Sequence, residues 1–187
     1  MWRRAFPALI AFGLVALTGA TAQAYNTYSG HRLKYGVYNQ YFWLDSQAEY
    51  WHPTAIRAGV GHWNATTDTT VWYVNTGDRS KSRLDFYRRD DPDVRYCATT
   101  QMYVGTDQVE PRQSDWVWAK VIMHSNLLKD WYCGPDTHRD GIVAHEQGHA
   151  MGLDHNGNAS SLMYSDVANT RVDVPIGDDR NGINYLY

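Results

Sequence analysis

The stretch HEQGHAMGLDH, which begins at His145, constrains the fold more tightly than any other part of this chain. Residues four apart on a helix lie on one face, one turn apart, so a helix over 137–151 brings the rings of His145 and His149 together. A glycine just past the last helical residue can adopt the conformation that ends a helix, and Gly152 stands there. The chain can then turn back and bring His155 to the same point.

Three imidazole nitrogens at one point are the ligand set of a catalytic zinc site, because three protein ligands leave one coordination position open. Zinc lowers the pKa of a bound water toward neutrality. Glu146 is offset from the ligands on the same helix, so its carboxylate can take a proton from that water as general base. We therefore predict a zinc-bound water that attacks a carbonyl polarised by the same ion. A bare His-Glu-x-x-His also occurs by chance on ordinary helices, but Gly152 and His155 favour the metal site.

The first 24 residues have the parts of a secretory signal peptide. A positive start, MWRR, precedes the apolar run FPALIAFGLVALTG, and the small residues of AQA predict cleavage between Ala24 and Tyr25. The alternatives are an uncleaved membrane anchor and, from the pair Arg3-Arg4, a twin-arginine export signal. We expect a secreted, extracellular protein in which residues 25–187 form one functional domain.

Charge and hydropathy narrow the class of partner. Two of the 17 basic residues and none of the 20 acidic residues lie in the predicted signal, so residues 25–187 carry a formal charge of −5. A modestly acidic surface argues against nucleic acid or anionic lipid as the main partner. No later apolar stretch approaches transmembrane length, so we expect no stable membrane insertion after signal cleavage. The expected product is a monomer that acts on a protein or peptide substrate.

Apolar patterning predicts an α+β domain over 25–187. Helical spacing runs through YWHPTAIRAGVGHWN at 50–64, and a last helix is expected to begin near Asp178-Asp179. Runs of β-branched and aromatic residues predict strands. These runs are LKYGVY (33–38), VWYVN (71–75), LDFYR (84–88), TQMYV (100–104) and WVWAKVIMH (116–124). We expect a twisted mixed sheet of about five strands with a backing helix, an active-site helix and a C-terminal helix.

The chain has two cysteines, Cys97 and Cys133. In an exported protein an even pair is most simply one disulfide, here closing a loop of about 35 residues. Such a loop contributes ~3 to 4 kcal/mol in the chain-entropy description of disulfide stabilisation.

The histidine motif resembles the metzincin signature His-Glu-x-x-His-x-x-Gly-x-x-His, and SLMY at 161–164 follows at the distance of its Met-turn. The Leu-Asp-His ending, the Met-Tyr pair and the closing DDRNGINYLY resemble matrixins, the family of matrix metalloproteinase catalytic domains. The resemblance covers essentially all of 25–187 and implies the zincin-like fold. It implies one catalytic zinc ion with the ligands His145, His149 and His155, Glu146 as catalytic base, and Met163 as a hydrophobic floor beneath the metal.

Other metzincin branches differ at positions near the metal. Astacin-like and serralysin-like relatives carry a tyrosine two residues after the methionine, where this chain has Ser165, so Tyr164 is not expected to be a ligand. Snapalysin-type proteases use an aspartate as third ligand. Asp154 precedes His155 here, but His155 occupies the matrixin offset.

Animal matrixins also bind a structural zinc and calcium through a His-rich loop, which we do not find in this sequence. Calcium stays possible at the Asp-rich stretch RRDDPDVR, although a solvated charged turn is the favoured interpretation. Typical matrixins carry a propeptide cysteine that caps the zinc. The residues before Tyr25 are the predicted signal, so we expect export without a cysteine switch. Cys133-Gly-Pro-Asp lacks the residue that the switch has between its glycine and proline, and Cys133 has a candidate disulfide partner in Cys97.

The resemblance also implies a substrate cleft. AKVIMHSNLL at 119–128 resembles the matrixin edge strand, so an extended peptide is expected to pair with it, and Val121 and Met123 are expected to line the cleft. The segment from Tyr164 to Pro175 is expected to wall the pocket for the side chain after the scissile bond, with preference for a medium or large apolar residue.

Two other functions are compatible with this pattern. A zinc hydrolase of cell-wall peptides would keep the same site but fail on ordinary proteins. A non-catalytic, secreted, metal-stabilised binding domain is disfavoured by Glu146, because a structural site needs no base and favours a fourth protein ligand. The sequence therefore predicts a zinc metalloendopeptidase.

Overall fold

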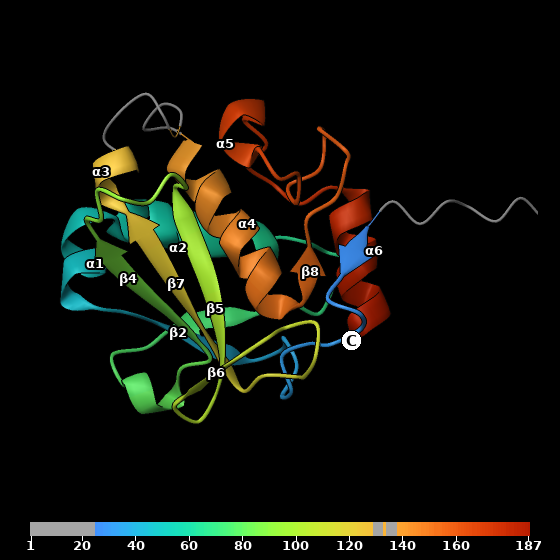
Figure 1. Ribbon diagram of the computed structural model, residues 1–187. Coiled ribbons are helices and arrows are strands. Elements are labelled where there is room, and N and C mark those ends of the chain that lie inside the picture. The colour runs from blue at the N-terminus through green and yellow to red at the C-terminus, as the bar shows by residue number, and fades with distance from the viewer. Residues whose placement is uncertain (1–24, 129–132, 134–137) are drawn as a thin grey trace, which may run out of the picture.

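The computed structural model describes residues 25–128, 133 and 138–187, and the predicted signal peptide lies outside the described residues. Figure 1 shows a sheet with α2 and α4 on one face and α5 and α6 beyond α4. No helix within the described ranges is long and apolar enough to cross a bilayer. The elements are β1 Asn26–Thr27, β2 Gln40–Leu44, α1 Ser46–Trp51, α2 Pro53–Asn64, β3 Tyr73–Asn75, η1 Arg79–Lys81, β4 Leu84–Arg89, β5 Ala98–Val104, β6 Asp107–Val109, β7 Trp118–His124, α3 Ser125–Leu128, α4 Arg139–Met151, β8 Leu153–Asp154, α5 Val167–Thr170 and α6 Gly177–Leu186.

The main sheet has six strands in the order β3-β2-β4-β7-β5-β6, and β1 pairs with β8 in a small separate sheet. The strands β3, β2, β4 and β7 are parallel, whereas β5 is antiparallel to both β7 and β6. This mixed sheet confirms the predicted fold class. Since β6 pairs only with residues 102–104, the first half of β5 has no strand on its outer side among the described residues.

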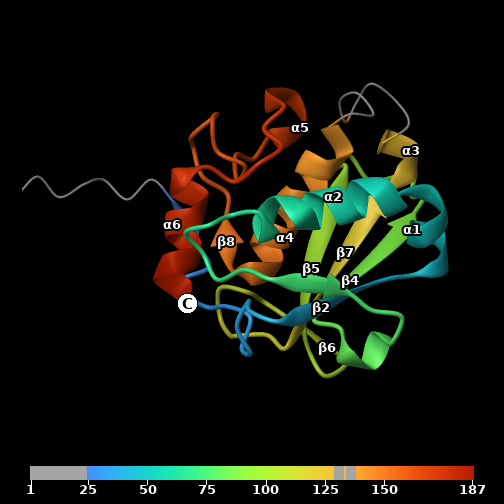
Figure 2. The same cartoon turned by 180° about the vertical axis from the view of Figure 1, so that it is seen from behind.

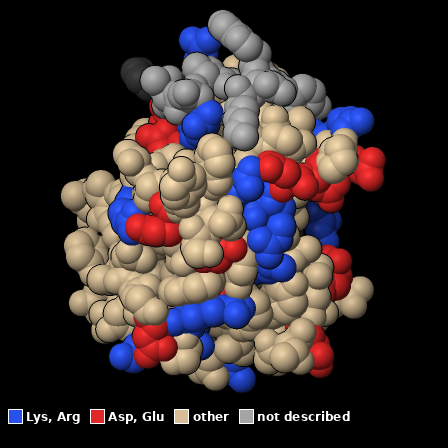
Figure 3. Space-filling view, turned by 90° about the vertical axis from the view of Figure 1, so that its left-hand side faces the viewer, with Lys and Arg blue, Asp and Glu red and all other residues tan. Residues whose placement is uncertain are grey.

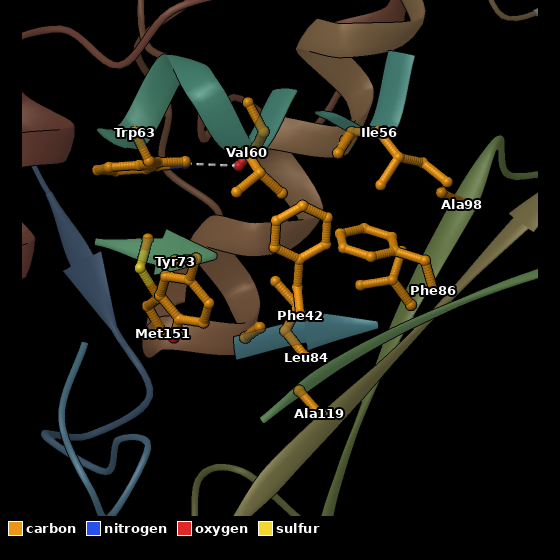
Figure 4. Close-up of a cluster of buried hydrophobic side chains, with 14 of the residues drawn as sticks. Phe42, Ile56, Val60, Trp63, Tyr73, Leu84, Phe86, Ala98, Ala119 and Met151 are labelled. Carbon is orange, nitrogen blue, oxygen red and sulfur yellow. Dashed lines mark hydrogen bonds between the residues drawn. The ribbon is translucent and has the colours of Figure 1, made fainter. Parts of the chain in front are cut away.

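The core lies between the sheet and the helices. Alternate side chains of each strand point to the helices, so Phe42 in β2 and Phe86 in β4 are buried. Their rings meet edge to face at 6.1 Å, and Figure 4 shows them beneath Ile56 and Val60 of α2. This apolar layer fixes α2 on the sheet.

The backing helix α2 approaches α4 closely because a glycine stands at the contact. A Cβ atom at Gly59 would lie 2.5 Å from the Asp140 carbonyl oxygen and 2.6 Å from the Val143 side chain. Figure 2 shows α2 lying over α4 and the strands. The position of α4, which carries the histidine motif, is therefore set by the core.

The N-terminal region differs from the sequence prediction. Residues 33–38 do not form a strand, because Gly36 turns the chain with a φ of 78° and only Leu33 makes an isolated bridge, to Trp116. The apolar positions of the pattern, Leu33 and Val37, are nonetheless both buried in the core. The strand β2 and the short helix α1 follow directly and were not predicted.

The other face of the sheet carries aromatic side chains together with cations. Arg79, Arg89 and Lys120 lie 5.6, 5.3 and 5.1 Å from the ring centroid of Tyr87. Figure 3 shows Lys and Arg side chains gathered on this side of the molecule. Cation–π contacts stabilise this arrangement, and they concentrate positive charge locally on a chain of net charge −3.

Candidate metal centre

The helix α4 is held in place by two buried tryptophans. Residues 141–151 of the helix are all buried. The indole N–H of Trp63 donates to the Ala144 carbonyl at 2.8 Å, and that of Trp116 donates to the Ala150 carbonyl at 2.8 Å. These bonds anchor the helix on two sides, so its side chains present a fixed geometry to the cavity beside it.

Gly152 ends α4 as the sequence predicted. Its φ of 122° is a conformation that L side chains rarely adopt. A Cβ atom here would also lie 2.7 Å from Leu186 Cδ1 and 3.0 Å from the His31 carbonyl oxygen. The chain therefore turns at once into β8, whose end brings His155 back toward the helix.

The three histidines of the motif converge. The Nε2 atoms of His145 and His149 are 3.0 Å apart, and each lies 3.1 Å from Nε2 of His155. Backbone carbonyls orient the two helical rings, because Nδ1–H of His145 donates to Leu162 at 2.6 Å and Nδ1–H of His149 donates to Leu153 at 2.8 Å. Both rings thereby direct Nε2 toward the shared point.

The electrostatics of this cluster fit a bound cation. Burial lowers the pKa of His145 to about 4, and it lowers the pKa values of His149 and His155 as well. With Nδ1 protonated in the helical pair, neutral rings place lone pairs on Nε2, and facing lone pairs repel unless a cation lies between them. Imidazole nitrogen is a preferred zinc ligand, so these residues fit the metal that the sequence predicted.

Asp154 does not compete with His155 for the third position. Its carboxylate forms an ion pair with Arg112 and accepts the backbone N–H of His155 at 2.9 Å. The convergent group consists of histidines alone. The geometry therefore supports the matrixin offset rather than the snapalysin one.

Glu146 lies beside the cluster and is held by a strand residue. Its side chain is buried, and Oε2 accepts a hydrogen bond from the Thr100 hydroxyl of β5 at 2.6 Å. Burial raises the pKa of Glu146 to about 7, while the Thr100 hydrogen bond acts in the opposite direction. A carboxyl group with such a pKa can both accept and return a proton near neutral pH.

Thr100→Val should lower the rate of any reaction that uses Glu146 as base. The variant keeps the shape of the side chain and removes the hydroxyl that orients Oε2, so we expect kcat to fall by about 10-fold with KM nearly unchanged. Thr100→Ser keeps the hydroxyl and serves as the control. Equal kcat values for the valine variant and the wild type would show that this hydrogen bond has no catalytic role.

Met163 packs beneath the helix that carries the histidines. Its side chain is buried, and a Cβ atom at Gly148 would lie only 2.4 Å from the Met163 sulfur. Gly148, one residue before His149, therefore makes room for the methionine. The structure places Met163 against α4 at Gly148, and its role as a hydrophobic floor beneath a metal stays a prediction.

A buried aspartate of α6 holds the turn that contains Met163. The carboxylate of Asp179 is fully buried and accepts the backbone N–H groups of Leu162 at 3.0 Å and Met163 at 3.3 Å. It also accepts the Ser161 hydroxyl and the N–H of Ile176 at 2.9 Å. The Leu162 carbonyl accepts from the ring of His145, so the Asp179 carboxylate supports His145 indirectly, by holding the backbone of Leu162.

A cavity of about 860 Å³ opens beside the histidines. One side is formed by β5 and the residues just before it, including Tyr96 and Thr100. The opposite side is formed by residues 165–169, which follow the Met-turn, and the three histidines and Glu146 lie at its floor. The site is therefore open to a substrate rather than enclosed as a structural metal site would be.

The predicted cleft residues need correction. Val121 and Met123 are fully buried in β7, which lies between β4 and β5 inside the sheet. The prediction that they line the cleft is wrong, because β5 and not β7 is the strand beside the cavity. Tyr164 forms an isolated bridge with Asn156 and does not line the cavity either, although the next five residues do.

Three site residues were missed by the sequence reasoning: Thr100, Tyr28 and Asp179. The Tyr28 hydroxyl lies 2.9 Å from Nδ1 of His149, and its ring lines the cavity. The acidic pair at 178–179 predicts a helix N-terminus, and Asp179 does lie in the first turn of α6. Its contacts with the Met-turn leave no local signal in the sequence. The sequence offered no pattern that marks Thr100 or Tyr28.

The predicted disulfide between Cys97 and Cys133 is present, with the two Cα atoms 5.7 Å apart. Cys97 precedes β5 directly and lines the cavity, and Cys133 lies shortly before α4. The disulfide therefore joins the strand side of the cavity to the chain that leads into the motif helix.

The Asp-rich stretch RRDDPDVR has local partners for its charges. Asp90 forms an ion pair with Arg88, and the Asp91 carboxylate accepts the backbone N–H of Asp93 at 3.0 Å. Within the ranges that the structure describes, only the histidine triad gathers three or more ligand groups at one point. Calcium binding by this stretch gains no support.

Comparison with known proteins gives one result for the whole domain. A family model described as matrixin matches residues 27–187. The match includes the histidine motif, the Met-turn and the C-terminal helix. A search of curated proteins finds no match.

Proposed function

The chain belongs to the matrixin family, a family of zinc metalloendopeptidase-type domains, and from this we propose that it is an active, exported, zinc-dependent endopeptidase. One observation supports the proposal above all others. Three imidazoles converge within 3.1 Å of one another, beside a buried carboxylate, at the floor of an open cavity. This set suits a catalytic metal with a free coordination position.

The residues divide the chemistry among them. His145, His149 and His155 would hold zinc, which when bound supplies Lewis-acid activation of water and of a peptide carbonyl. Glu146 accepts the proton of the attacking water on a side-chain oxygen and delivers it to the leaving amine. The Thr100 hydroxyl orients that carboxylate at 2.6 Å. Met163 and Asp179 keep the histidine geometry fixed while these protons move.

The outer edge of β5 is the proposed binding site for the substrate backbone. Residues 98–101 have main-chain groups on the side away from β7 that no described strand pairs with, and residues 98–100 line the cavity. An extended peptide can add to such an edge by main-chain hydrogen bonds. A side chain of the peptide then enters the cavity toward Val167 and Ala168.

Export and extracellular action remain part of this proposal. The sequence of residues 1–24 has the pattern of a signal peptide, and a disulfide persists best in an oxidising compartment. We further propose that the released protein acts as a monomer.

Cleavage of a reduced and alkylated protein by the purified protein tests this function. We expect cleavage that stops when zinc is removed by a chelator and resumes when zinc is restored, with product ends that define the preferred side chains. If the zinc-loaded, folded protein cuts cross-linked cell-wall peptides but not proteins, the alternative hydrolase function holds. If it cuts neither, the binding-domain alternative gains support.

Zinc should also stabilise the fold measurably. At a free zinc concentration of about 1,000 times Kd, binding contributes ~4 kcal/mol, which corresponds to a rise in Tm on the order of 10 °C. His149→Ala should lose this rise, because it removes one ligand of the triad. His31→Ala, at a half-exposed histidine paired with Asp115, should keep it. An equal rise in both variants, measured by calorimetry, would place the zinc elsewhere.

A further inference from the structure

A buried histidine outside the metal cluster connects α4 to the far wall of the cavity. His138 immediately precedes α4, and its side chain is 2% exposed. The ring does not cap the helix. Its Nε2 lies 2.8 Å from the carbonyl oxygen of Val167, and its Nδ1 contacts the carboxylate of Asp173.

One partner of this ring lies in residues 165–169, which wall the cavity, and the other lies four residues beyond that wall along the chain. Val167 lines the cavity and begins α5, and Asp173 lies three residues after α5 ends. The ring therefore crosslinks two points of residues 167–173 to the start of the motif helix. The distance across the cavity, from β5 to this wall, depends on where that crosslink holds the segment.

The two contacts require two donors. A carbonyl oxygen and a carboxylate oxygen are both acceptors, and a neutral imidazole has only one N–H. With a neutral ring, one of the contacts would bring a nitrogen lone pair against an oxygen lone pair. The imidazolium satisfies both, so this geometry belongs to the protonated ring with Asp173 as its counter-charge.

The surroundings are shaped for this pair. A Cβ atom at Gly141 would lie 2.6 Å from Asp173 Oδ1 and 2.8 Å from His138 Cε1, so only glycine leaves the space. The structure gives other contacts for the charged side chains nearby. On α4, Arg139 donates to the Leu128 carbonyl and Asp140 pairs with His62 of α2. At α5, Asp166 accepts from Asn169, and Arg171 is the exposed C-cap residue. Asp173 is thus the charged partner that the ring contacts.

We propose that His138 is a positioning residue whose protonated ring holds the cavity wall, so that the choice among substrate side chains depends on pH. This inference rests on the proposed endopeptidase function. Histidine changes charge near neutral pH. Loss of the ring proton removes one of the two bonds, the segment from Val167 to Asp173 relaxes, and the cavity accepts side chains of different size more equally.

The kinetic test compares two peptides that differ only in the side chain after the scissile bond, one small and one large and apolar. At each pH, kcat/KM for the peptide with the large apolar side chain is divided by kcat/KM for the peptide with the small one. This ratio cancels the titration of the catalytic groups, since both substrates share them. We expect this ratio to fall by about fivefold to tenfold between pH 5.5 and 8.5 in the wild type. His138→Gln and Asp173→Asn should show the lower ratio at both pH values.

His62→Gln is the matched control, because His62 also contacts a carboxylate, at 3.0 Å, but not the wall. It should keep the pH-dependent ratio of the wild type. Asp173→Asn guards against misfolding of the buried variant, since the Asp173 side chain is 39% exposed. A ratio that does not change with pH in the wild type, or that changes equally in all variants, would overturn the proposal.

A second measurement does not depend on activity. In ¹⁵N-histidine spectra of the zinc-loaded protein, assigned with His138→Gln, we expect both ring nitrogens of His138 to be protonated at pH 5.5. The backbone amides of residues 167–169 should shift together with this ring as pH rises. A singly protonated ring at pH 5.5 would overturn the proposal even if cleavage is found. If no cleavage is found, the endopeptidase function fails and these spectra still decide the role of the ring.

Discussion

Glu146→Gln should reduce kcat by about 10²- to 10⁴-fold, the usual contribution of a general base. Glutamine has nearly the same shape and its side-chain oxygen can still accept the Thr100 hydroxyl, which lies 2.6 Å from Oε2 in the wild type. It cannot take a proton near neutral pH. The histidines are unchanged, so zinc content and the zinc-induced rise in Tm should match the wild type, and the loss should appear in kcat rather than in KM.

The chain offers a matched control for this variant. Glu49 is an exposed glutamate on α1 that pairs with Arg57 at 2.8 Å and does not line the cavity. Glu49→Gln should retain full activity. If Glu146→Gln also retained wild-type kcat at equal zinc content, another group would have to be the base, and the proposed division of roles would be wrong.

Asp179→Ala should have the largest effect on stability, a loss of ~3–5 kcal/mol in the free energy of unfolding. The carboxylate is fully buried and accepts hydrogen bonds from three backbone N–H groups and one hydroxyl. Alanine would leave these donors buried without an acceptor. Denaturant unfolding of the metal-free protein measures the loss directly, since it removes the contribution of bound zinc.

The same substitution should weaken zinc binding. Asp179 holds the backbone of Leu162, and the Leu162 carbonyl orients His145 at 2.6 Å. Loss of such a supporting contact usually costs 10- to 100-fold in metal affinity, and we expect about that factor here. Competition with a chromogenic chelator measures it.

Asp178→Ala is the control for both effects. Asp178 is the adjacent acidic residue, and its carboxylate accepts from the Asn158 side chain at 2.9 Å at a half-buried position. We expect a change within about 1 kcal/mol and an unaltered zinc affinity. Equal losses for Asp178→Ala and Asp179→Ala would mean that the first turn of α6, and not the carboxylate under the Met-turn, stabilises the domain.

Local sequence patterns were enough to predict the candidate metal site. The helical spacing of His145 and His149 and the glycine at 152 need only helix geometry and backbone conformational freedom, and both act within one or two turns. The structure accordingly places the Nε2 atoms of the two rings 3.0 Å apart and ends α4 just before Gly152. The same holds for the strands 84–88 and 100–104, whose residues prefer a pleated, half-buried surface.

Strand order was decided only by the tertiary structure. A buried strand between two others and a strand beside a cavity have similar compositions, so the run 116–124 was assigned to the cleft although it lies inside the sheet. Val121 and Met123 are apolar because they fill the core, not because a substrate contacts them. At 33–38, alternation came from a turn with two buried side chains.

The supporting contacts of the site also came from the fold alone. Thr100 and Glu146 are 46 residues apart in the chain, and Asp179 is 16 to 18 residues from the Met-turn residues that it contacts. His138 is 29 residues from Val167 and 35 residues from Asp173. Sequence by itself predicted which three histidines come together as candidate metal ligands, because their spacing follows from one helix and one turn. Which residues orient those ligands and shape the cavity was decided by tertiary packing, because a hydrogen bond between distant segments leaves no periodic trace in the chain.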